Sequence, residues 1–122
     1  MGLGTNVQPM VSSLSFVVPA GETQTALIEA DGSLLLGADS GTSSIVELRL
    51  VIDNNAVQVI RTEIVNYQAG HMSNGWHLHA LAPLTGGSHE THVDARVIAG
   101  TNAVQVNNTY PGRLSMLLFR GN

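Results

Sequence analysis

The sequence has no cysteine, and its five basic residues are all arginine, so lysine is missing as well. The absence of cysteine excludes disulfides, thiolate catalysis and cysteine-ligated zinc. Charged residues form only 11% of the chain, less than half of the usual fraction. Because nine acids outnumber the five arginines and no basic cluster occurs, we predict that the protein does not bind nucleic acid.

Long apolar runs and catalytic motifs are missing too. No segment approaches the ~18 apolar residues that a membrane span requires, so we expect no membrane partner. The first residues lack the basic stretch and apolar core of a signal peptide, which predicts synthesis in a host cytoplasm without export. Since no nucleophile elbow, phosphate loop or HExxH motif occurs, we predict that the protein is not an enzyme.

What the sequence does contain is a succession of short segments in which apolar and polar residues alternate, as they do in β-strands. The clearest is Ser44–Ile52, with Leu48 and Leu50 on one face, Glu47 on the other, and a strong turn at Asp53-Asn54-Asn55. Further strands are expected at residues 12–18, 23–30, 34–36, 56–67, 103–106 and 113–119, with a turn at 31–33. Such short strands without a helical period predict one all-β domain, either an antiparallel β-sandwich or a barrel.

The segment Gly75–Gly100 contains four of the five histidines and reads as a strand, a tight Gly-rich turn and a second strand. This pattern predicts a β-hairpin. Residues two apart in a strand share a face, so His77 and His79 are expected to project together. Pairing across the turn would place His77 near Asp94 and His79 near His92, with Cβ atoms ~5 Å apart.

Two interpretations of these histidines remain open. Imidazoles at that spacing, together with a carboxylate, could hold Zn²⁺, Ni²⁺ or Fe²⁺, which makes His77, His79 and His92 candidate metal ligands within or between subunits. The other interpretation, which we favour, is a polar outer sheet face with cross-strand hydrogen bonds and no cofactor. A cupin site is excluded, because Ala80-Leu81-Ala82-Pro83 follows the second histidine where a glutamate ligand would be needed.

A more specific pattern lies in the second half of the chain. An apolar residue, a Gly-rich corner and an H-x-x-x-V-x-A strand entry follow one another at Leu84, Gly87, His89, Val93 and Ala95. A Gly-Thr-Asn turn and the strand LSMLLFRG come next, and the strand VELRLVIDNN precedes them. This layout resembles the C-terminal half of the tumour necrosis factor/complement-type jelly roll, which also occurs in phage head and tail proteins and in some bacterial lectins. The resemblance spans about Ser44–Gly121 and implies a jelly-roll sandwich that packs as a homotrimer.

The chain is expected to divide into an N-terminal arm, residues 1–13, and a jelly-roll body, residues 14–122. Apolar side chains interrupt the polar arm and would be buried against a neighbouring subunit. The last strand is apolar on both faces, and contiguous exposed apolar area marks interfaces. The expected interface residues are Leu3, Val7, Met10, Val11, Leu117 and Phe119.

These features together predict a non-enzymatic structural protein of a virus-like particle, located in the virion as a capsid decoration or head–tail component. Its expected partners are further copies of itself in a homotrimer and other virion proteins such as the major capsid protein. One alternative is a carbohydrate- or receptor-binding, lectin-like module, for which Trp76 and Tyr110 are candidate platforms, although strand parity turns Trp76 toward the core. The second alternative is a small metal-binding jelly-roll protein that uses the three histidines.

Overall fold

The structure is a computed structural model that describes residues 2–10, 13–38, 43–65, 70–100, 104–106 and 112–120, and its regular elements are all strands. These are β1 (Gly2–Leu3), β2 (Gln8–Pro9), β3 (Leu14–Ala38), β4 (Ser43–Ile52), β5 (Asn55–Val65), β6 (Gly70–Gly100), β7 (Val104–Val106) and β8 (Arg113–Arg120). The prediction of an all-β chain is therefore confirmed. In this described part of the chain, no helix has the length and apolar character needed to cross a membrane.

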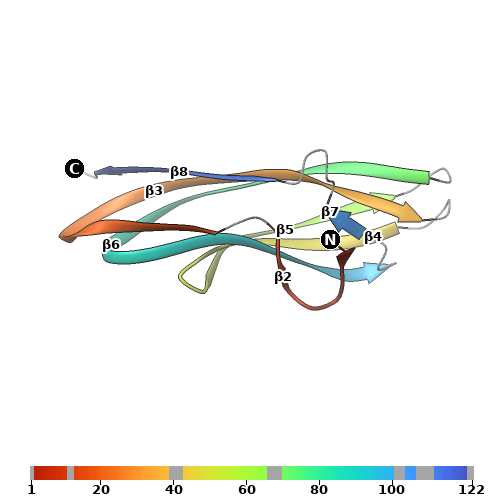
Figure 1. Cartoon of the computed structure of the whole chain (residues 1–122), viewed down its shortest axis with the longest axis horizontal. Helices are drawn as coiled ribbons and strands as arrows, with labels where there is room; N and C mark the ends of the chain where they lie inside the picture. Colours follow the sequence, from red (N-terminus) through yellow and green to blue (C-terminus); the bar gives the residue numbers. More distant parts are fainter. Residues whose placement is uncertain are drawn as a thin grey trace.

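All strand pairs are antiparallel and belong to one hydrogen-bonded sheet. The order along the sheet is β1-β7-β3-β6-β4-β5, with β2 added beside β6 and β8 beside β3. The sheet does not close, because β1 and β5 stand at opposite ends of this order. Figure 1 shows the long strands β3 and β6 running side by side through the middle of the molecule.

The predicted hairpin over Gly75–Gly100 is wrong, because this segment lies in the single strand β6, which pairs with β3. The pairing runs from Ala38 opposite Gly70 to Leu14 opposite Thr91. Its register shifts at one place, where both strands bend and the pair reverses direction at the left end of Figure 1. We call this pair the β3–β6 ribbon.

Close backbone packing explains why glycine stands at the bend of the ribbon. A Cβ on Gly86 would lie 2.7 Å from the carbonyl oxygen of Pro19, and Gly87 has a φ of 132°. The Gly-rich corner therefore reverses the chain as predicted, but within one long strand that bends together with its partner. The turn predicted at Asp31–Ser33 is also wrong, since these residues continue β3.

The β4–β5 hairpin is confirmed. Ile52 pairs with Asn55, which leaves Asp53 and Asn54 as a two-residue turn. Both have a positive φ, 49° and 68°, which is the backbone geometry of a type I′ turn that asparagine and aspartate tolerate well.

The core lies between the two halves of the folded β3–β6 ribbon. Ile28 and Leu78 come from the half that carries β8, whereas Leu48 and Val93 come from the half that carries β4, and all four are fully buried in one apolar cluster. These positions follow the predicted alternation. Because a flat sheet could not bury one face against itself, folding back of the ribbon is what gives this chain a core.

The N-terminal segment packs along the same chain. β1 pairs with β7, β2 pairs with β6, and the backbone N–H of Met10 donates to the carbonyl of Val93 at 2.8 Å. Leu3 and Met10 are buried in the core, whereas Val7 is 45% exposed. Val11 lies outside the described residues. The role of residues 1–13 as an arm that contacts a neighbouring subunit stays a prediction.

Candidate functional site

Two of the candidate metal ligands lie on the outer face of the first half of β6, beside β3 and β8. His77 lies opposite Asp31, and Asp31 lies opposite Arg113, whose guanidinium contacts its carboxylate at 3.4 Å. His79 lies opposite Glu29, and the imidazole rings of His77 and His79 stack with centroids 5.4 Å apart. Both histidines are exposed, which confirms that they project together on a polar face.

Their predicted partners across a hairpin, Asp94 and His92, lie instead on the second half of β6, beyond the bend. There His92 lies opposite Val51 of β4, and its Nδ1 contacts Glu90 at 3.0 Å. The predicted pairing is wrong because β6 pairs with β3 and β4 rather than with itself. Among the described residues, no group of three or more histidine, aspartate or glutamate side chains could hold a metal ion, and a metal shared between subunits stays a prediction.

Replacing both His77 and His79 by alanine should change the melting temperature by no more than about 2 °C, because exposed side chains of this kind contribute little to stability. Thermal unfolding with and without zinc measures this. A large loss, or a zinc-dependent rise in the wild type that the double variant lacks, would indicate that these imidazoles are buried or bridged in an assembly.

The two aromatic candidates for a sugar platform differ in what the structure says of them. Trp76 is 5% exposed and belongs to the core cluster, as strand parity predicted. Its indole packs over Gly32, where an added Cβ would lie 2.6 Å from the ring. Trp76 therefore presents no exposed ring face, and Tyr110 lies outside the described residues.

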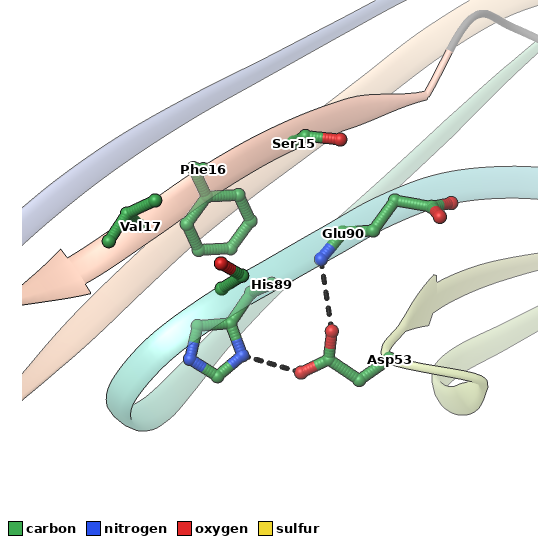
Figure 2. A pocket seen from close by; sticks show the side chains of 7 residues that line it. Ser15, Phe16, Val17, Asp53, His89 and Glu90 are labelled. Atoms are coloured by element: carbon green, nitrogen blue, oxygen red, sulfur yellow. Dashed lines mark hydrogen bonds and ion pairs between the residues drawn. The ribbon is translucent and has the colours of Figure 1, made fainter.

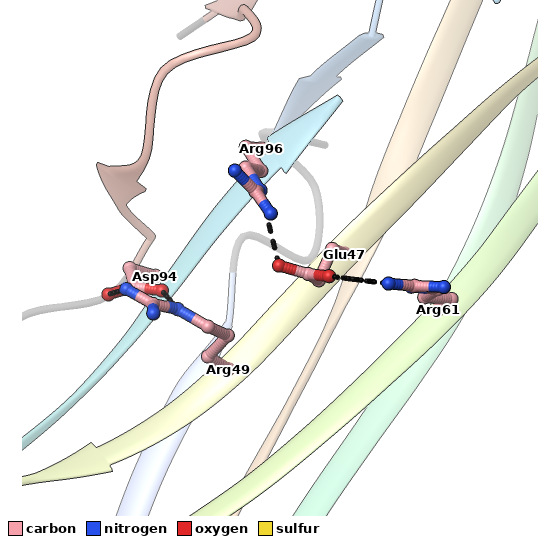
Figure 3. A network of polar contacts seen from close by, with 5 residues as sticks. All are labelled: Glu47, Arg49, Arg61, Asp94 and Arg96. Atoms are coloured by element: carbon pink, nitrogen blue, oxygen red, sulfur yellow. Dashed lines mark hydrogen bonds and ion pairs between the residues drawn. The ribbon is translucent and has the colours of Figure 1, made fainter. Parts of the chain in front are cut away.

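A network of charges covers the outer face of β4 and its neighbours (Figure 3). The carboxylate of Glu47 accepts hydrogen bonds from Arg96 at 3.2 Å and from Arg61 at 3.3 Å. Asp94 accepts a bidentate pair from Arg49 at 2.7 and 2.8 Å, and this hydrogen bond is the main cause that raises the pKa of Arg49. The alternation predicted an outward position for Glu47, but it did not predict that the carboxylates of Glu47 and Asp94 would be shielded by arginines.

The two carboxylates are well shielded, since the side chains of Glu47 and Asp94 are 8% and 7% exposed. Each is held by guanidinium groups from neighbouring strands, which is the arrangement of a structural ion pair. The network thus joins β4, β5 and β6 across their outer face.

A hollow of about 370 Å³ lies near the bend of the ribbon (Figure 2). Its lining comes from β3, β6 and the β4–β5 turn and consists of Ser15, Phe16, Val17, Asp53, Ser88, His89 and Glu90. The phenyl ring of Phe16 stacks on the imidazole of His89, with centroids 5.5 Å apart. The side chain of His89 is only 11% exposed.

Both ring nitrogens of His89 are engaged. Nδ1 contacts the Asp53 carboxylate at 2.5 Å, and Nε2 contacts the carbonyl oxygen of Thr85 at 2.7 Å. The hydrogen bond to Asp53, followed by that to Thr85, raises the pKa of His89. In return, the hydrogen bond from His89, followed by that from the Glu90 N–H, lowers the pKa of Asp53.

Serine, histidine and aspartate line this hollow together, but they do not form a nucleophilic triad. A triad needs one histidine nitrogen free to accept the serine proton while the other faces the carboxylate. In His89 that second nitrogen already faces the Thr85 carbonyl. In the sequence, His89 belongs to the histidine-rich segment and to the jelly-roll pattern, but no local signal joins it to Asp53, which lies 36 positions away.

The outer face that carries His77 and His79 becomes apolar farther along the same strands. Leu81 of β6, Leu27 of β3 and Leu117 of β8 lie in one cross-strand row, and Phe119 lies in the next. Leu81 is 65% exposed, Leu117 59% and Phe119 43%. We call these four residues the apolar row.

Comparison of the chain with family models, curated proteins and solved structures finds no match. Function must therefore be argued from the described residues themselves. Two features stand out, the apolar row and the engaged His89.

Proposed function

We propose that this chain is a non-enzymatic structural subunit of a virus-like particle, a jelly-roll sandwich that forms a homotrimer and acts as a capsid decoration or head–tail component. The observation that carries the proposal is the apolar row on the outer face of β6, β3 and β8. The folded β3–β6 ribbon, with one core between its halves, supports the sandwich architecture.

The apolar row is unusual because its members adjoin. Single exposed leucines need no explanation, whereas neighbouring ones form a patch of the kind that marks an interface. On a sheet face that water covers, the alternation should place polar residues there instead. A stable contact buries roughly 800 Å² per partner, so the row would form the centre of an interface with a polar rim supplied by neighbours such as Glu29 and Arg113.

Replacing Leu81 and Leu117 together by serine should convert the assembly to monomers, because both side chains would lose their burial against another subunit. Sedimentation equilibrium measures the result against the 12.8 kDa mass of one chain. The matched control replaces Val57 and Val59 of β5, which are 42% and 49% exposed, by serine as well. This control should leave the assembly intact. A wild-type protein that stays monomeric at high concentration would refute the trimer.

The particle assignment needs its own test. Purified subunit should co-sediment with capsids of the source virus and not with unrelated capsids, at a stoichiometry divisible by three. Loss of co-sedimentation in the Leu81/Leu117 variant, with retention in the Val57/Val59 control, would connect assembly with docking. Failure of the wild type to bind while it remains trimeric would reject the particle role and keep the trimer.

A further inference from the structure

The imidazole of His89 contacts two other parts of the fold, the β4–β5 turn and the segment of β6 before the bend. Its own strand segment lies after the bend of β6, whereas Thr85 lies before that bend. Asp53 belongs to the β4–β5 turn. The imidazole therefore connects the turn to both sides of the bend, through its contact with Asp53 at 2.5 Å (Figure 2) and its contact with the Thr85 carbonyl at 2.7 Å.

Two further hydrogen bonds align the turn with the segment of β6 after the bend. The Asp53 N–H donates to the Glu90 carbonyl at 3.0 Å, and the Glu90 N–H donates to Asp53 Oδ1 at 2.9 Å. These bonds hold the carboxylate in place, so its other oxygen is aimed at the His89 ring. The arrangement is preorganised for a donor at that point.

The chemistry of the two partners favours the protonated form of His89. A carboxylate and a carbonyl can only accept hydrogen bonds, and a neutral imidazole carries a single N–H. Neutral His89 could therefore satisfy one partner only and would turn a lone pair toward the other. The doubly protonated imidazolium satisfies both, which agrees with the raised pKa of His89.

Other charges near this ring are few among the described residues. From the β4–β5 turn, Asp53 faces it, and from β6 the nearest charged groups are Glu90 and His92, which pair with each other at 3.0 Å. The neighbouring residues of β3 that line the hollow are Ser15, Phe16 and Val17, none of which is ionisable. Among these groups, the one that contacts the His89 ring is therefore Asp53.

We propose that His89 is a protonation-controlled latch that fastens the bend of the β3–β6 ribbon to the β4–β5 turn. With the proton bound, the imidazolium holds both acceptors and the corner is closed. When the proton leaves, one of the two hydrogen bonds is lost, so the imidazole no longer joins the turn to Thr85, whereas the hydrogen bonds between Asp53 and Glu90 remain. This inference concerns the corner of a single chain and does not depend on the proposed particle role.

The direction of the pH effect follows from linkage. His89 has a raised pKa in the folded chain, so its contribution is complete below the unfolded value of about 6.5 and is lost as the pH rises through the folded pKa. Asp53 has a lowered pKa, so its contribution is present above about 3.9 and is lost as the pH falls through the folded value. The latch is therefore strongest between about pH 4 and 6.5 and opens on the alkaline side.

Histidine titration followed by NMR on the intact protein tests the latch. The His89 ring should titrate above the ordinary histidine value of about 6.5, and Asp53→Asn should lower its titration point. The wild-type melting temperature should fall by several degrees from pH 6 to pH 9, and His89→Gln should remove most of that fall. The control variant His77→Gln should keep the same fall in melting temperature between pH 6 and pH 9.

Hydrogen exchange gives a readout that a merely structural role would not change. The amides of residues 85–90 should lose protection as the pH rises, after correction for intrinsic exchange, whereas the central amides of β4 should keep theirs. If His89→Gln fails to fold, the Asp53→Asn protein and wild-type exchange still decide. A His89 ring that titrates at or below about pH 6.5, or a bend whose protection does not depend on pH, would overturn the proposal.

Discussion

Replacing Leu48 by aspartate should abolish folding. Leu48 is fully buried at the centre of β4. Loss of such a leucine costs about 2–5 kcal/mol from burial and cavity terms, and an unpaired carboxylate in the core adds several more. Since a domain of this size has roughly 5–15 kcal/mol of stability in total, the variant should show no cooperative unfolding transition and no dispersed NMR spectrum.

A charge on an exposed strand position provides the matched control for Leu48→Asp. Val59 of β5 is 49% exposed, so Val59→Asp leaves the new carboxylate in water and should shift the melting temperature only slightly. A folded Leu48→Asp protein with a normal melting curve would contradict the core described above. Equal damage from both substitutions would show that added charge, rather than burial, causes the effect.

Replacing Arg49 by alanine should have the second largest effect, a loss of about 2–4 kcal/mol in the free energy of unfolding. The substitution removes both hydrogen bonds to Asp94 and leaves a carboxylate whose side chain is 7% exposed. A buried charge without its partner keeps its desolvation cost and loses its compensation. Chemical denaturation at neutral pH gives the free energy directly.

The double variant Arg49→Ala with Asp94→Ala separates this explanation from simple loss of packing. If the stranded carboxylate causes the damage, the double variant should be more stable than Arg49→Ala alone. The comparison Arg61→Ala removes an arginine that is 66% exposed and leaves Glu47 with Arg96, so its cost should be well below that of Arg49→Ala. A double variant that loses the sum of both single effects would rule out the buried-charge explanation.

The parts of the fold that could be predicted from the sequence are those whose signal is local. The β4–β5 hairpin depends on alternation within a few residues and on Asp53-Asn54, which accept positive φ. Parity along β6 likewise predicted the buried Trp76 and the exposed His77 before any pairing was known.

The pairing of β6 could not be predicted in this way. Gly86-Gly87 indicates that the chain changes direction, but it does not indicate which strand lies beside it. A hairpin and a bent two-strand ribbon place the same residues at the corner. They differ in pairing, because in the ribbon β6 pairs with β3, which bends at the same place near Pro19, rather than with itself. Strand partners separated by long stretches of chain leave no periodic trace in either segment.

The candidate sites show the same division. The exposure of Leu117 and Phe119 followed from a strand that is apolar on both faces. The row that they form with Leu81 needed the register between β3, β6 and β8. The contact of His89 with Asp53 also needed tertiary structure, because its two acceptors come from different elements.

The nested order of strands has a consequence for how the chain folds. Along the sequence, the β4–β5 hairpin comes between the two strands of the β3–β6 ribbon. The ribbon pair closest in sequence is Ala38 with Gly70. Once the hairpin closes at Asp53, the entropic cost of joining these two residues is small, and pairing can proceed outward residue by residue toward Leu14 and Thr91. We therefore expect folding to start at this two-residue turn. Pairing of β3 with β6 should then proceed from Ala38 and Gly70 toward Leu14 and Thr91, and β8 should pair with β3 last.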